Sequence, residues 1–190
     1  MPTELPILPF KTQRAFGAWL KKNHAASSGL WLKIAKAGAY PSITYAEALE
    51  EALCYGWIDG QKKSFDAEWW LQKFTPRGPR SIWSQINRDK VLALIAAGRV
   101  QPAGLAAIEA AKKNGRWDAA YAGQRTAELP ADFQAELDRR PQAKAFYATL
   151  NSANRFAIMF RLQSAKKPET RARRMQQFLE MLEKGEKLYP

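Results

Sequence analysis

The sequence predicts an α+β fold: a small, mainly antiparallel sheet covered by helices and followed by a C-terminal helical region. Alternating apolar residues predict one strand over 30–34, and aromatic-rich runs predict two more over 57–65 and 68–74. Stretches with apolar residues at helical spacing lie before the first strand, between the first two and after the third. After Pro130 the apolar residues keep helical spacing, which predicts a helical end of the chain.

The helices around the first strand have capping signals. Thr12 can cap a helix that reaches Asn23, because a hydroxyl there accepts a hydrogen bond from one of the first free backbone amides. Thr44 and Glu47 have the spacing of a capping box, which predicts a second helix that ends at Gly56.

Side chains of the first strand should alternate between the two faces of the sheet. Leu30, Leu32 and Ile34 fall on one face, and Trp31 and Lys33 fall on the other. The apolar set identifies the face that we expect to meet the helices.

Turn residues organise the other two strands. Asp59-Gly60 predicts a turn after a short extended segment, from which the chain returns as the third strand. Pro76 and Pro79 cannot donate backbone hydrogen bonds to a neighbouring strand, so residues 75–81 should form a constrained loop.

Helices account for most of the remaining chain. One begins at Ser81 or Ser84 and ends at Gly98, and Pro102 opens another that runs through Asn114 and is followed by Gly115. Further helices are expected over 131–139, 141–150, 152–164 and 168–185. A polar stretch interrupts this pattern, so we expect an α+β core over 1–121, a linker over 122–130 and a C-terminal helical region over 131–190.

Composition narrows the class of protein. The net charge of +12 creates a positive field that attracts polyanions or small anions. No apolar run is long enough to cross a bilayer, and the N-terminus lacks the pattern of a signal peptide. Together with a single cysteine, these features favour a cytoplasmic protein.

The sequence argues against several kinds of catalytic or cofactor site. One histidine, His24, and one cysteine, Cys54, are too few for a zinc centre, and no nucleophile motif surrounds the serines or the cysteine. Glycine-rich nucleotide loops are absent, so we expect no metal and no cofactor. Cys54 lies in a helical apolar pattern and is expected to pack as a small hydrophobic residue.

Candidate ligand-binding residues gather between positions 57 and 87. Arg77 and Arg80 flank a Gly-Pro pair and could present two guanidinium groups to a carboxylate or phosphate, although such arginines often pair with acids instead. Asp59 could be a pocket acid or a turn residue that bonds its own backbone. The candidate set is Trp57, Asp59, Lys62, Arg77, Arg80, Trp83, Ser84 and Asn87.

Four tryptophans lie in the same region, and we expect two of them to be packed in the core. Trp57 and Trp83 adjoin polar residues, so these two are expected to face a pocket.

Several motifs of the chain resemble the bacterial YdeI/OmpD-associated, or bacteriocin-protection, family. The resemblance rests on residues 45–60, 74–77, 81–84, Asn87, 104–105 and 115–121, together with 165–171 and 173–174 in the C-terminal region. It implies an association with bacteriocin tolerance and with an outer-membrane porin, but no reaction and no catalytic residues.

Three functions follow as hypotheses. The first is binding of a small or anionic ligand in stress or toxin tolerance. The second is nucleic-acid binding through the basic, aromatic-rich residues of 62–90, although no recognised nucleic-acid motif is present. The third is an enzyme that uses Asp59 with Arg77 or Arg80.

Overall fold

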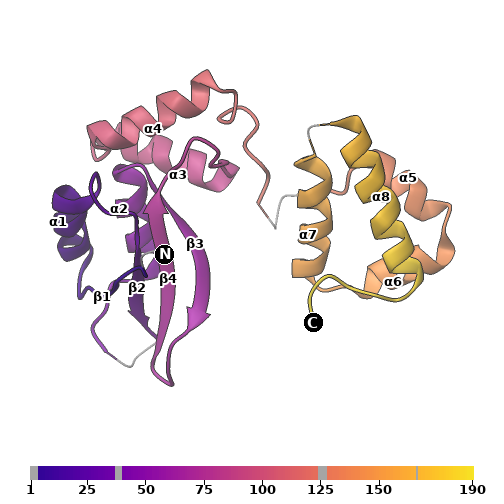
Figure 1. Ribbon diagram of the computed structural model, residues 1–190, viewed down its shortest axis with the longest axis horizontal. Coiled ribbons are helices and arrows are strands. Elements are labelled where there is room, and N and C mark those ends of the chain that lie inside the picture. The colour runs from indigo at the N-terminus through magenta and orange to yellow at the C-terminus, as the bar shows by residue number, and fades with distance from the viewer. Residues whose placement is uncertain (1–3, 37–39, 124–127, 166) are drawn as a thin grey trace. The chain divides into compact units, whose positions relative to one another are not determined.

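The protein has the predicted α+β architecture (Figure 1). The computed structural model describes residues 4–36, 40–123, 128–165 and 167–190. The chain forms two compact units, one that ends at Ala120 and one that begins at Tyr121. The predicted linker, 122–130, lies partly outside the described residues. No described helix is both long enough and apolar enough to cross a membrane.

A four-stranded sheet is the centre of the N-terminal unit. Its strands are β1 (Ile7–Pro9), β2 (Leu30–Ala35), β3 (Trp57–Ser64) and β4 (Trp69–Pro76), and their order is β1-β2-β4-β3. The β2–β4 and β4–β3 pairs are antiparallel, as predicted, whereas β1 pairs with β2 in parallel. Strand β1 is not predicted from the sequence, because three residues that end in a proline carry no alternation signal. An edge strand tolerates that proline.

The hairpin between β3 and β4 turns later than predicted. Asp59-Gly60 does not form the turn, because β3 continues to Ser64 with an irregularity in register between Asp59 and Lys62. The chain reverses around Asp66, whose carboxylate accepts hydrogen bonds from the backbone amides of Glu68 and Trp69 at 2.9 and 2.7 Å. A carboxylate that bonds the following amides in this way stabilises a tight turn.

Strand β4 also ends later than expected, at Pro76. Pairing with β2 stops at Phe74, which lies opposite Leu30, and only β3 accompanies β4 as far as Pro76. A proline is tolerated there because only one neighbouring strand remains to be bonded.

Four helices of this unit begin where the sequence predicts, three of them after a capping residue and the fourth at Pro102. They are α1 (Gln13–Asn23), α2 (Tyr45–Cys54), α3 (Gln85–Ala96) and α4 (Pro102–Lys113). Thr12 caps α1, Thr44 and Glu47 form the capping box of α2, and Ser84 caps α3. The core includes Leu30, Leu32, Ile34, Phe16, Leu20, Leu49, Leu53, Phe74 and Val91.

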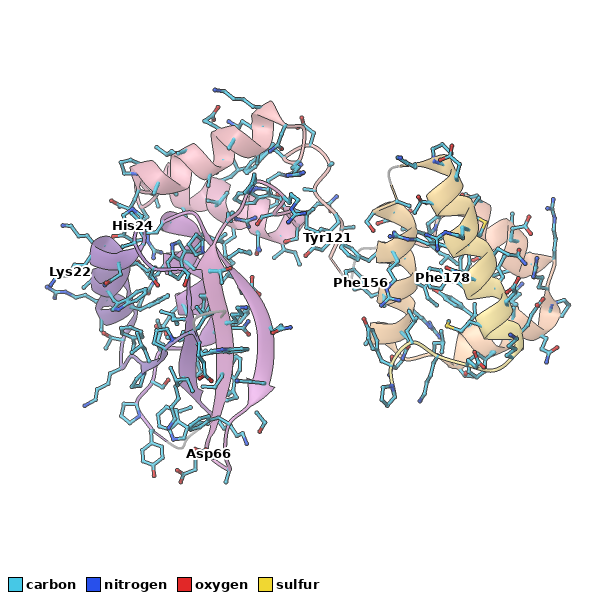
Figure 2. All side chains as sticks on the ribbon, viewed as in Figure 1. Lys22, His24, Asp66, Tyr121, Phe156 and Phe178 are labelled. Carbon is cyan, nitrogen blue, oxygen red and sulfur yellow. The ribbon has the colours of Figure 1, made fainter. Side chains whose placement is uncertain are left out.

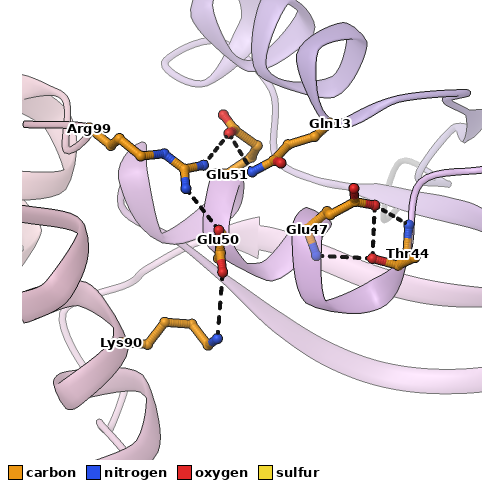
Figure 3. A network of polar contacts seen from close by, with 7 residues as sticks. All are labelled: Gln13, Thr44, Glu47, Glu50, Glu51, Lys90 and Arg99. Carbon is orange, nitrogen blue, oxygen red and sulfur yellow. Dashed lines mark hydrogen bonds and ion pairs between the residues drawn. The ribbon is translucent and has the colours of Figure 1, made fainter. Parts of the chain in front are cut away.

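A polar network links α1, α2 and the connection between α3 and α4 (Figure 3). The Arg99 guanidinium lies 2.8 Å from a Glu50 oxygen and 2.7 Å from a Glu51 oxygen. The Gln13 amide donates to Glu51 at 3.0 Å. Burial alone would lower the pKa of Arg99, but its hydrogen bonds to the two glutamates raise it. Because Arg99 bonds both glutamates, it crosslinks α2 to the connection that leads into α4.

Four helices build the C-terminal unit: α5 (Ala131–Asp138), α6 (Pro141–Thr149), α7 (Ser152–Gln163) and α8 (Pro168–Glu183). Their bounds agree with the predicted ones to within two residues. Phe178, on α8, belongs to their shared core (Figure 2). That core also contains Phe133, Leu137, Ala143, Leu150, Ile158, Leu162, Leu179 and Leu182.

Candidate functional site

Trp57 lies in the core and does not face a pocket, contrary to expectation. Its side chain is only 1% exposed, and its indole nitrogen donates to the backbone oxygen of His24 at 3.2 Å. Trp19 of α1 meets it edge to face, with ring centroids 5.8 Å apart. Trp57, the first residue of β3, packs its side chain against α1. Its closeness in sequence to the polar Asp59 therefore does not indicate where its side chain lies.

Asp59 and Lys62 lie on the face of the sheet that the helices cover. The Asp59 carboxylate accepts a hydrogen bond from the Tyr45 hydroxyl of α2 at 2.8 Å, so its side chain does not serve a turn. The Lys62 ammonium lies 4.2 Å from the centre of a Trp70 ring. Each of these two polar groups therefore contacts an aromatic side chain of the same unit.

Arg77 and Trp83 come together as a stacked pair. The guanidinium carbon of Arg77 lies 3.5 Å from the centre of a Trp83 ring, and one of its nitrogens donates to the Ile82 carbonyl at 3.1 Å. Trp83 is 3% exposed and packs edge to face on Trp117. Both Arg77 and Trp83 line a small pocket beside α4.

The remaining candidates have different surroundings. Arg80 is exposed in the loop after β4. The Ser84 hydroxyl accepts a hydrogen bond from the backbone N–H of Asn87 at 3.1 Å, which is its role as the cap of α3. Cys54 is buried as predicted, and burial raises the pKa of its thiol to about 11. A thiol of this kind is a poor nucleophile at neutral pH.

A second group of side chains occupies the face of the sheet opposite the helices, and we call it the open face. The register places Trp31 and Lys33 of β2 beside Lys73 and Leu71 of β4. Lys63 of β3 lies opposite Leu71 on its other side. Side chains of a strand alternate, so these residues point away from the face that carries Leu30, Leu32 and Ile34.

Lysine ammonium groups lie over aromatic rings on the open face. Lys33 is 4.6 Å from the ring centres of both Phe65 and Trp69, and Lys63 is 4.2 Å from a ring centre of Trp31. Leu71 is fully buried, yet it belongs to neither core cluster. The lysines and tryptophans around Leu71 therefore cover it from the solvent side.

Acidic groups gather at the hairpin end of the open face. The Glu68 carboxylate accepts a hydrogen bond from Tyr40, whose ring stacks on Trp69 at 5.4 Å, and Glu68 raises the pKa of that tyrosine. Asp66 serves the turn. Nearer its centre, the face carries Lys33, Lys63 and Lys73, which makes that part of the surface positive.

A family model described as a domain of unknown function, DUF8412, matches residues 8–107, which is more than half of the chain. The chain belongs to this family. A second model, described as bacteriocin-protection, YdeI or OmpD-associated (OmdA), matches residues 126–185 and confirms the family resemblance predicted from the sequence. This match suggests a role related to bacteriocin protection. No curated protein and no solved structure matches the chain significantly.

The two matches fall in different parts of the chain. The DUF8412 match contains β2, β3 and β4 and all of β1 except Ile7, whereas the OmdA match contains the four C-terminal helices. Most motifs that carry the predicted resemblance lie between residues 45 and 121, but the residues that the OmdA model matches are those of α5 to α8. The open face therefore belongs to the DUF8412 part of the chain.

The open face was missed as a site although its signal was present. Trp31 and Lys33 alternate with the apolar residues of β2, which already placed them opposite the core. Their partners, Lys63 and Trp69, could not be assigned without the register, because the strand order places β4 between β2 and β3. The candidate site predicted from the sequence instead consists of residues that are close to one another in the chain, between positions 57 and 87.

Proposed function

We propose that the DUF8412 unit binds single-stranded nucleic acid across the open face of its sheet. The observation that carries the proposal is the interleaving of three lysines with the rings of Trp31, Trp69 and Phe65 on a face that the helices of the unit leave uncovered. Aromatic rings stack on nucleobases, and lysines neutralise phosphates.

The existing cation–π contacts allow lysines and rings to exchange partners when nucleic acid binds. Lys33 and Lys63 lie over the rings that a base would occupy. A phosphate would draw each ammonium away from its ring, and the freed ring would then accept a base. Ammonium and ring would each exchange one favourable contact for another. A net charge of +12 adds long-range attraction for a polyanion.

The shape and chemistry of the open face argue against binding of duplex nucleic acid and against catalysis there. A duplex hides the flat faces of its bases, so it cannot use the exposed rings. The open-face residues that we assign include no pair of a nucleophile with a general base, which covalent catalysis would need. We propose nucleic-acid binding as the molecular step by which this unit serves the role that the OmdA match suggests.

A charge-matched pair of variants tests the phosphate contacts. Fluorescence anisotropy of a labelled single-stranded oligonucleotide would be followed over a salt series for the wild type and for the triple variant K33Q/K63Q/K73Q. The control K21Q/K22Q/K113Q removes the same charge from exposed positions on α1 and α4. Each lost phosphate contact lowers the salt slope by about 0.7, so the open-face variant should lose roughly two units of slope and the control almost none.

Substitutions at Phe65 test the stacking contact separately. Phe65 is 47% exposed, so its replacement should leave the fold intact. Phe65→Ala should weaken binding by roughly 1 to 3 kcal/mol, and Phe65→Leu, which keeps an apolar side chain without a flat ring, should weaken it nearly as much. Phe65→Tyr should bind like the wild type. Equal losses in both triple variants, or no measurable binding by the wild type, would refute the proposal.

A further inference from the structure

A small pocket lies between the loop that follows β4 and helix α4. Its volume is about 230 Å³. The loop supplies one wall with Arg77 and Trp83, and α4 supplies the other with three alanines. The lining residues are Arg77, Gly78, Pro79, Ser81, Trp83, Ala107, Ala110, Ala111 and Asn114.

Charge around this pocket is positive. None of the lining residues is acidic. Arg77 belongs to the wall, Arg80 lies in the same loop, and the Arg116 guanidinium donates a hydrogen bond to the Pro79 carbonyl. One guanidinium group, that of Arg77, therefore lines a cavity with an apolar side, and Arg80 and Arg116 add positive charge at the loop that forms its wall. This arrangement suits a ligand with one negative group and an apolar body.

We propose that this pocket binds a small monocarboxylate with a flat apolar body, of the size of benzoate. A water molecule takes about 30 Å³ of liquid volume, so 230 Å³ has room for about eight of them, which is close to the size of a benzoate ion. The apolar body would lie between Trp83 and the alanines of α4, and the carboxylate would point towards the arginines. A hydrated dianion such as phosphate suits the alanine wall poorly, because burying its charge is costly.

The donors of the pocket are held in place before a ligand arrives. Arg77 is fixed by its stack on Trp83 and by its hydrogen bond to the Ile82 carbonyl. The Ser81 hydroxyl accepts a hydrogen bond from the Gly78 amide at 3.0 Å, which leaves its own hydrogen to donate. Donors that are already ordered lose less conformational entropy on binding.

The pocket and the open face are independent sites with different ligands. Of the residues predicted from the sequence, the pocket keeps Arg77 and Trp83, with Arg80 nearby, and Asp59 is engaged with Tyr45 instead. The two proposals can fail separately, because none of the lysines in the oligonucleotide experiment lines the pocket.

Sodium benzoate is the probe for the experiment, with isothermal titration calorimetry as the readout and sodium chloride at equal ionic strength as the control. A dissociation constant on the order of 1 mM or below is expected for a ligand of this size. Benzamide, which has the same shape without the charge, should bind at least about tenfold more weakly, since it lacks the contact with the guanidinium groups.

Matched substitutions on one helix locate the site. Ala110→Leu would fill the pocket without removing any charge, and should lower benzoate affinity at least about tenfold. Ala106→Leu, at an exposed position of α4 that does not line the pocket, should leave affinity unchanged. Arg80→Gln should weaken binding less than Ala110→Leu does. Absence of benzoate binding, equal binding of benzamide, or full affinity in a folded Ala110→Leu variant would each overturn the proposal.

Discussion

Replacing Gly104 with alanine should separate α4 from α2. A methyl group added at Gly104 would lie 2.3 Å from the Cys54 carbonyl oxygen, 3.0 Å from its carbon and 2.8 Å from Val100 Cγ1. The nearest atom belongs to the backbone at the end of α2, so no side-chain rotation relieves that contact. The same carbonyl oxygen accepts a hydrogen bond from the Gln101 amide at 2.9 Å, which ties the start of α4 to this point.

Two effects of opposite sign decide the stability of this variant. Alanine is favoured over glycine inside a helix by about 1 kcal/mol. Overpacking at a tight contact costs about 1 to 3 kcal/mol, and more when the backbone has to move. A contact of 2.3 Å lies far inside normal van der Waals distance, so the second effect should dominate. We expect a net loss of roughly 2 kcal/mol and a melting temperature of the N-terminal unit lower by roughly 8 °C.

Tryptophan fluorescence during chemical denaturation reports the unfolding of the N-terminal unit, which contains Gly104, because all seven tryptophans precede residue 121. The control is Ala106→Gly, at an exposed position of the same helix. It should lose about 1 kcal/mol from helix propensity alone. If the Gly104→Ala variant were as stable as the wild type or more stable, our inference that α4 packs closely on α2 at Gly104 would be refuted.

Three other predictions concern single contacts. Cys54, with a pKa raised to about 11, should resist thiol reagents at pH 8 until the protein unfolds, and rapid labelling of the native protein would contradict its burial. Asn154→Ala removes an amide that bonds both the amide and the carbonyl of Tyr189, so hydrogen exchange at Tyr189 should accelerate. Arg171 lowers the pKa of Asp132, so this carboxylate stabilises the fold above its unfolded pKa of about 3.9, and the contribution disappears as the pH falls through the folded pKa. Asp132→Asn should therefore show a shallower loss of stability in acid, measured by circular dichroism.

Helix positions could be predicted because their signals are local. Thr12, Thr44 and Ser84 each bond amides within three residues of themselves, so the sequence pattern alone determines the contact. Pro102 begins its helix for a similarly local reason. Such signals need no knowledge of strand order.

Side-chain environments in the sheet could not be predicted in the same way. Whether Trp57 meets solvent or α1 depends on the register of β3 against β4 and on where the helices pack. The partner of Asp59 is Tyr45, fourteen residues earlier and on another element. Lys63 reaches Trp31 only because β4 brings β3 and β2 together. These contacts follow from tertiary structure, so spacing along the chain cannot reveal them.

The lysines of the open face also have a structural role, and this affects how the binding experiment is interpreted. Lys33 and Lys63 help to cover Leu71 and neighbouring rings, which lowers the apolar area that the sheet exposes. A purely protective role requires cover over the rings but no particular charge, because long uncharged side chains would shield Leu71 as well. Nucleic-acid binding requires the charge itself. Replacement by glutamine keeps part of each side chain and removes only the ammonium, so a folded, soluble triple variant that loses salt-dependent binding would separate binding from protection.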